Sequence, residues 1–107
     1  MVQTGAKRSW SVASSAELYG LNHWGDPYFS INAKGHIVVQ PRGDRSGCLD
    51  LVELLGGLEA RDLHPPLLIR FDDILEDRLE RLHAAFERAI NHYAYEGSYQ
   101  GVFPIKC

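Results

Sequence analysis

The sequence contains little cysteine, little net charge and no long apolar run. Its two cysteines, Cys48 and Cys107, are too few for a disulfide framework, which favours a reducing, cytoplasmic setting. A formal net charge of −3 gives no basic surface of the kind that binds nucleic acid or an anionic membrane. No apolar segment reaches the length of a membrane span, and the start, MVQTGAKRSW, lacks the apolar stretch of a signal peptide. We therefore expect neither a nucleic-acid nor a membrane partner.

The histidines do not predict a metal site. His83 and His92 fall within one predicted helix, but a rotation of about 100° per residue places them on opposite faces. The other histidines lie in separate segments without ligand-like spacing, at His23, His36 and His64. Local hydrogen bonding at the surface is the simpler interpretation, and no metal ligand is assigned.

The composition is that of a folded domain, and the first third of the chain predicts β-strands and loops. Apolar residues make up 45% of the chain and charged residues 23%, as in ordinary globular proteins. Two β-prone runs, YFSIN (28–32) and HIVVQ (36–40), are separated by AKG, where Gly35 suits a hairpin turn. Pro41 ends the second run, because proline cannot continue a ladder of hydrogen bonds.

Helical spacing begins after Asp50, which is a candidate N-cap. The leucines that follow it recur at i, i+3, i+4 and i+7: Leu51, Leu54, Leu55 and Leu58. A longer helix is predicted from Asp73, because Glu76 follows at the spacing of a capping box. Asp77 and Arg81 are spaced for an ion pair on its solvated side. Its apolar stripe predicts a buried face made of Leu75, Leu79, Leu82, Phe86, Ile90 and Tyr93.

Two short apolar runs flank this longer helix. LLIRF (67–71) precedes it and has the continuous apolar character of a strand buried on both faces. VFPIK (102–106) follows it, although Pro104 is unusual within a strand. The order strand, helix, strand predicts a right-handed βαβ unit with parallel strands. Because one helix cannot cover such a sheet, we expect the chain to be a piece of a larger protein.

Lys106 is the residue whose predicted place favours chemistry. It ends the second predicted strand, and catalytic side chains of (β/α) barrels project from that end of the strands. A partly desolvated lysine there can form a Schiff base, although most lysines at strand ends only reach solvent. Asp72 and Asp73 follow the first predicted strand, but helix capping explains at least one of them.

Three stretches of the chain resemble the biosynthetic arginine decarboxylase family. They are ELYGLNHWGDPYFSINAKGHIVVQP, PLLIRFDDILEDRLERLHAAFERAI and YQGVFPIKC, and the resemblance extends over residues 10–107. In that family the lysine of the PIK motif holds pyridoxal phosphate (PLP) as a Schiff base, and Lys106 stands at that position. The resemblance thus implies that Lys106 is both the catalytic and the cofactor-binding residue. The implied reaction converts L-arginine to agmatine and CO2 for polyamine biosynthesis.

The resemblance also implies a fold and a division of the chain. The implied fold class is α/β, the start of a PLP-binding (β/α)8 barrel of the alanine-racemase type, preceded by strands of a β-rich domain. We expect residues 1–9 to be disordered, residues 10–47 to join the β-rich domain, and residues 48–107 to begin the barrel as helix, strand, helix and strand. A magnesium ion and a homo-oligomeric parent enzyme follow from the resemblance alone, and we expect the isolated chain to be inactive.

Two other interpretations stay open. A non-catalytic PLP-binding barrel, of the kind that maintains PLP supply, also places its lysine early in the barrel. Such proteins lack an added β-domain, whereas WGDPYFSIN (24–32) and the run after it predict one. A small α/β binding module is the other possibility, but its parallel sheet would remain uncovered.

Overall fold

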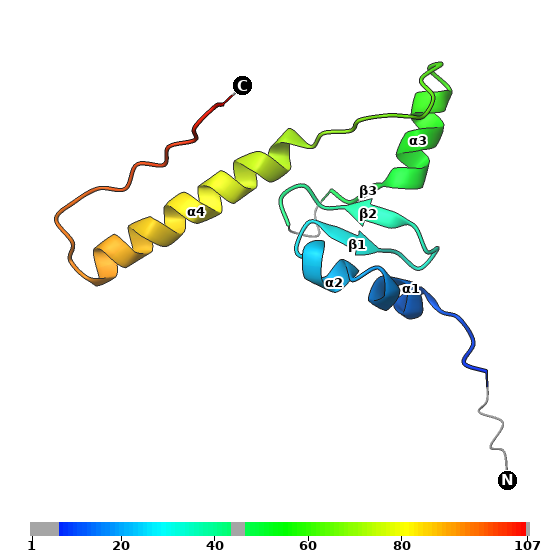
Figure 1. The fold of residues 1–107 in the computed structure, drawn as a ribbon, viewed down its shortest axis with the longest axis horizontal. Helices are drawn as coiled ribbons and strands as arrows, with labels where there is room; N and C mark the ends of the chain where they lie inside the picture. Colours follow the sequence, from blue (N-terminus) through cyan, green and yellow to red (C-terminus); the bar gives the residue numbers. More distant parts are fainter. Residues whose placement is uncertain (1–6, 44–46, 107) are drawn as a thin grey trace, which may run out of the picture. The chain divides into compact units, whose positions relative to one another are not determined.

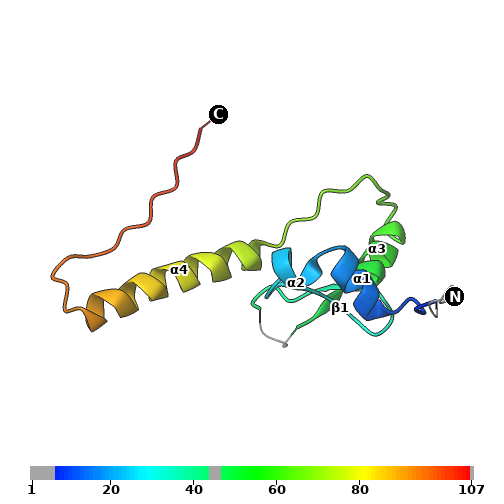
Figure 2. The same ribbon diagram turned by 60° about the horizontal axis from the view of Figure 1, so that its bottom comes forward.

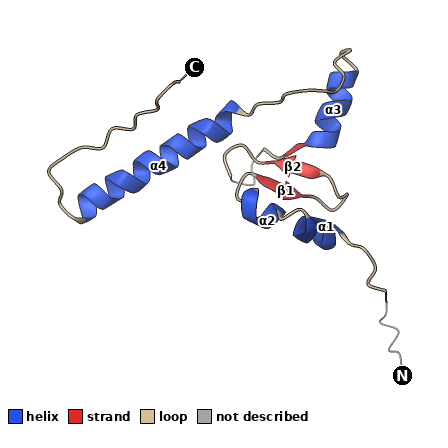
Figure 3. Ribbon diagram, in the orientation of Figure 1, coloured by secondary structure: helices blue, strands red, loops and turns tan. Residues whose placement is uncertain are grey.

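The computed structural model describes residues 7–43 and 47–106, which fall into two compact units that divide between Arg70 and Phe71 (Figure 1). The first unit contains a small sheet and three helices, and the second contains one long helix and the segment that follows it (Figure 3). The prediction of disorder for residues 1–9 falls mostly on residues 1–6, which lie outside the described residues.

Two short helices open the first unit, so the prediction of only strands and loops in this region was wrong. They are α1 (Val12–Leu18) and α2 (Leu21–Trp24). The hydroxyl of Ser11 accepts a hydrogen bond from the Ser14 N–H at 3.1 Å, and the Ser14 hydroxyl accepts one from the Ser11 N–H at 3.3 Å. This reciprocal capping starts α1, with serine in the place that glutamate or glutamine usually takes.

A three-stranded antiparallel sheet follows, in the order β1 (Phe29–Ile31), β2 (Ile37–Val39) and β3 (Leu49–Asp50). The predicted hairpin is confirmed, since Phe29 pairs with Val39 and Ile31 with Ile37. Gly35 lies in its turn with a φ of +82°, a conformation that glycine adopts without strain. β3 was not predicted, because two residues are too short to show an alternating pattern.

The core of the first unit is small and centres on β2. Val39 is fully buried, at 0% exposure, and the other buried apolar residues described are Ala16, Leu21, Tyr28 and Val38. Helices α1 and α2 contact β1, and α3 (Leu51–Glu59) contacts β2 and β3 (Figure 2). The predicted N-cap of α3 is confirmed, because the Asp50 side chain accepts hydrogen bonds from the first turn of the helix.

The second unit is built on α4 (Asp72–His92), the longer helix that the sequence predicts. Its N-cap is Phe71, which makes no side-chain cap, so the prediction of Asp73 as N-cap was wrong. Asp72 and Asp73 lie in the first turn, where negative charge favours the helix dipole. The predicted ion pair is confirmed, with Arg81 Nε 2.6 Å from Asp77 Oδ2. Asp77 itself is buried rather than solvated, at 8% exposure.

Neither predicted strand forms in the part of the chain that the structure describes. Residues 67–71 and 102–106 are in neither helix nor strand, so the predicted βαβ unit was wrong for this chain. A strand exists only when its backbone groups bond to a neighbour, and no described segment pairs with either run. The apolar stripe of α4 is correspondingly exposed, with Leu75 at 63% and Leu79 at 57%. The fold is thus a small mixed α/β structure, and the barrel stays a prediction.

Candidate functional site

Lys106, the predicted catalytic residue, lies in the segment that follows α4, and its side chain is exposed. The apolar neighbours Val102, Phe103 and Ile105 are 81%, 85% and 84% exposed. Within the described ranges, no residue forms a hydrogen bond or ion pair with its amine. The lysine is therefore accessible but is not enclosed in a pocket.

A PLP site needs more than an amine. The phosphate requires backbone N–H donors, and the ring nitrogen requires a charged partner. Lys106 fits the covalent attachment, since a lysine amine reacts with an aldehyde. Among residues 7–43 and 47–106, no cradle for the phosphate and no carboxylate is brought into contact with this amine. Asp72 and Asp73 begin α4 and are likewise exposed.

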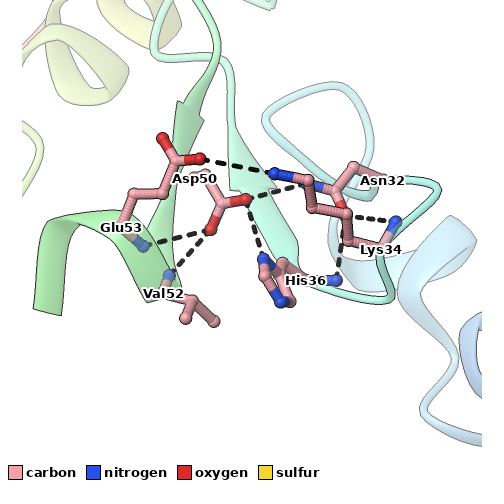
Figure 4. Close-up of polar contacts among 6 residues, drawn as sticks. All are labelled: Asn32, Lys34, His36, Asp50, Val52 and Glu53. Atoms are coloured by element: carbon pink, nitrogen blue, oxygen red, sulfur yellow. Dashed lines mark hydrogen bonds and ion pairs between the residues drawn. The ribbon is translucent and has the colours of Figure 1, made fainter. Parts of the chain in front are cut away.

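The best-defined polar arrangement lies elsewhere, between the hairpin turn and the start of α3 (Figure 4). We call it the Asp50 cluster, and its members are Asn32, Lys34, His36, Asp50, Val52 and Glu53. The sequence predicted only one part of it, the capping role of Asp50. The contact between His36 and Asp50 was missed, because it depends on the pairing of β2 with β3.

The two carboxylate oxygens of Asp50 serve two different elements. Oδ1 accepts hydrogen bonds from the backbone N–H groups of Val52 at 2.9 Å and Glu53 at 3.3 Å. Oδ2 accepts one from Asn32 Nδ2 at 2.8 Å and lies 2.9 Å from His36 Nδ1 (Figure 4). One side chain thus joins the hairpin turn to the first turn of α3.

The side chain of Asn32 also stabilises the hairpin turn, through its oxygen atom. Its side-chain oxygen accepts hydrogen bonds from the N–H groups of Lys34 and His36, each at 3.0 Å. Such side-chain bonds to a nearby backbone stabilise tight turns. Lys34 also reaches Glu53, with Nζ 3.8 Å from Oε1, but both side chains are largely exposed and the pair contributes little.

These contacts keep Asp50 ionised. Burial raises the pKa of its carboxyl group, but hydrogen bonds from His36, Glu53, Asn32 and Val52 outweigh that effect and lower the pKa to about 2. Because Asp50 is an anion at neutral pH, His36 Nδ1 is assigned as the protonated donor. In the described structure no group of three or more His, Cys, Asp or Glu side chains could hold a metal ion. The cluster is therefore suited to fixing local structure.

The known proteins to which this chain is similar share one name. The chain is 71% identical over 101 residues to a protein of Synechococcus sp. (strain RCC307) named biosynthetic arginine decarboxylase, a match that covers 94% of this chain and 16% of the relative. Proteins of the same name from Prochlorococcus marinus (strain MIT 9313) and Thermosynechococcus vestitus are 71% and 58% identical, over 94% and 92% of this chain and 15% and 16% of those relatives.

The chain therefore spans about a sixth of the length of these relatives. No family model and no solved structure matches it. Among the described helices, none is both long and apolar enough to cross a bilayer. The family that the motifs predicted is confirmed by matches over nearly all of the residues. The chain belongs to the biosynthetic arginine decarboxylase family.

Proposed function

We propose that this chain forms part of an enzyme that converts L-arginine to agmatine and CO2, and that Lys106 is the residue that holds PLP. The observation that carries the proposal is the 71% identity over 94% of the chain to a protein named biosynthetic arginine decarboxylase. The exposed amine of Lys106 is compatible with this role, because no residue in the described ranges forms a hydrogen bond or ion pair with it.

Bound PLP supplies an electron sink, which allows the carboxylate of an amino acid to leave as CO2. Lys106 would bind the aldehyde of the cofactor covalently and would give it up when the substrate amine arrives. Attachment requires the neutral amine of Lys106, and release requires a neutral amine on the substrate. A water-poor pocket favours the neutral form of an amine. The walls of such a pocket would come from the rest of the enzyme.

The proposal includes the wider setting implied by the resemblance. The enzyme would supply agmatine for polyamine biosynthesis and would act as a homo-oligomer. A magnesium ion would belong to the same setting, and the described side chains include no group of three or more His, Cys, Asp or Glu that could hold it. The barrel around Lys106 would be completed by the remaining length of the protein.

A chimeric enzyme tests the proposal. In the Synechococcus sp. (strain RCC307) relative, the matching segment of 101 residues is replaced by this chain, and CO2 release from labelled arginine is measured. We expect an active chimera, and we expect Lys106→Ala to lower the rate by at least about a thousandfold, since the covalent attachment is lost. Lys106→Arg should fail as well, because a guanidinium stays protonated. Lys34→Ala is the control and should remain active.

Borohydride reduction followed by peptide mass spectrometry locates the cofactor. Reduction makes the lysine–cofactor bond permanent, so the adduct should appear on the peptide that contains Lys106. An adduct on Lys34 would contradict the assignment. An adduct on Lys106 in a chimera that releases no CO2 would instead favour a non-catalytic PLP-binding barrel.

A further inference from the structure

The chain reverses direction at the end of α4 through a well-formed helix stop (Figures 1 and 2). Ala94 adopts a left-handed conformation, with a φ of +49°. The N–H of Tyr95 donates to the Ile90 carbonyl at 3.0 Å, and the N–H of Ala94 donates to the Asn91 carbonyl at 3.4 Å. This pattern is the Schellman motif, which satisfies the last carbonyl groups of a helix and sends the chain away from its axis.

Past this turn, the ring of Tyr99 returns to the side of α4. It stacks on Phe86, with ring centroids 4.0 Å apart and planes inclined by 3°. His83, one helical turn earlier on α4, lies 5.8 Å from the same ring. Rings that pack face against face bury apolar surface, and this burial favours the contact. Residue 99 is therefore held beside the middle of α4 and not beside its end.

Gly101 leaves room for the ring of Tyr99. A side chain at Gly101 would place its Cβ 3.3 Å from the Tyr99 hydroxyl, which is tighter than an ordinary contact. Tyr99 is half-buried, whereas Val102 and Phe103 beyond it are 81% and 85% exposed. Among the described residues, Tyr99 is the last before Lys106 that makes a ring contact or hydrogen bond.

We propose that Tyr99 is a positioning residue for Lys106. Its stack on Phe86 fixes where the returning segment leaves α4, and therefore the point from which the last seven residues reach the lysine. This inference rests on the proposed function, because it needs Lys106 to hold the cofactor. Misplacement of a reacting group by about 1 Å can lower a rate by roughly a hundredfold, so a remote anchor of this kind affects chemistry without touching the substrate.

Variants of the chimeric decarboxylase test the inference. Tyr99→Leu keeps an apolar side chain but removes the stack, and Tyr99→Phe keeps the ring but removes the hydroxyl. Tyr95→Leu is the matched control, because Tyr95 is 64% exposed and makes no ring stack in the described structure. For each variant, kcat, KM and the fraction of Lys106 that borohydride fixes to PLP are measured.

We expect Tyr99→Leu to lower kcat by about tenfold to a hundredfold and to reduce the fixed fraction, with KM for arginine changed less than threefold. Tyr99→Phe and Tyr95→Leu should behave like the unchanged chimera. If Tyr99→Leu does not fold, Phe86→Leu breaks the same stack from the helix and should give the same pattern. In a double variant the two effects should be less than additive, because both remove one contact.

The two proposals fail in different ways. If the unchanged chimera carries PLP on Lys106 and loses neither kcat nor fixed cofactor when the stack is removed, the positioning role of Tyr99 is wrong and the proposed function stands. If the unchanged chimera carries no PLP on Lys106, the proposed function is wrong and the positioning role falls with it. Equal losses in Tyr99→Leu and Tyr95→Leu would also overturn the role of Tyr99, because they would indicate a general loss of folding.

Discussion

The imidazole of His36 lies against the carboxylate of Asp50, with Nδ1 and Oδ2 2.9 Å apart. His36 precedes β2 and Asp50 ends β3, so this contact crosses between two neighbouring strands. Because the same carboxylate caps α3, the pair connects a turn, a sheet and a helix that are separate in the sequence. The charge state of Asp50 should therefore control the stability of the first unit.

Acid should destabilise the first unit between about pH 4 and pH 2. The pKa of Asp50 is lowered to about 2 in the folded chain, whereas an unperturbed aspartate has a pKa of about 3.9. A lowered pKa contributes stability that is fully present above pH 4 and is lost as the pH falls through 2. Urea unfolding followed by circular dichroism at several pH values measures this contribution.

In Asp50→Asn this contribution is absent, so the difference in stability between the unchanged chain and the variant should shrink as the pH falls from 4 to 2. Glu17→Gln is the control, because Glu17 is an exposed acid on α1. A difference for Asp50→Asn that stays constant from pH 6 to pH 2 would contradict the electrostatic role of Asp50.

Gly25→Ala should destabilise the first unit by about 1–3 kcal/mol, because it forces the backbone to move. A Cβ at Gly25 would lie 2.5 Å from the Leu21 carbonyl oxygen and 2.8 Å from that of Phe29. Gly56→Ala is the matched control in α3, where nothing lies within 4 Å of the added Cβ. It should raise the free energy of unfolding by about 1 kcal/mol through helix propensity. Thermal or urea unfolding measures the change in the free energy of unfolding for both variants. Changes of the same sign and similar size would contradict the prediction that Gly25 has no room for a side chain.

Ala94→Gly should stabilise the end of α4 by about 0.5–1 kcal/mol. Ala94 has a positive φ of +49° at the position where glycine is favoured after a helix. The helical circular dichroism signal should persist to higher temperature in this variant. Ala85→Gly, in the interior of α4, should have the opposite effect and cost about 1 kcal/mol. Loss of stability in both variants would mean that the helix does not end as described.

The isolated chain should self-associate through the exposed stripe of α4. Leu79 and Leu82 are 57% and 49% exposed, and an apolar face of this kind promotes association. Sedimentation velocity under reducing conditions should show a mass that rises with concentration. The double change Leu79→Gln and Leu82→Gln should reduce that rise, whereas Arg78→Gln on the same helix should not. A chain that stays monomeric at all concentrations would contradict this expectation.

The elements predicted well are those whose signals lie within a few residues. Gly35 between two β-prone runs was enough to predict the hairpin, and Asp50 before a leucine repeat was enough for the start of α3. The ion pair of Asp77 with Arg81 follows from helical spacing alone. In each of these cases the partners are fixed by local geometry, so no knowledge of the remaining chain is required.

The predictions that failed depend on partners distant in the sequence or on an uncommon local signal. The runs at 67–71 and 102–106 have strand-like composition, but no described strand pairs with either of them. Helix α1 was missed because Ser14 takes the place of the expected acid in its capping box. For the candidate site, the PIK motif predicts Lys106, but the groups that would surround its amine cannot be deduced from that motif.

No residue separates the end of β3 from the start of α3. Asp50 ends the strand, pairs with Val38 across the sheet and caps the helix that begins at Leu51. One inserted residue would rotate α3 by about 100° relative to the sheet, or would separate the carboxylate from the N–H groups that it caps. Insertions and deletions that accumulate during evolution should therefore avoid this point, and the distance from strand to helix should be invariant among natural variants of this chain.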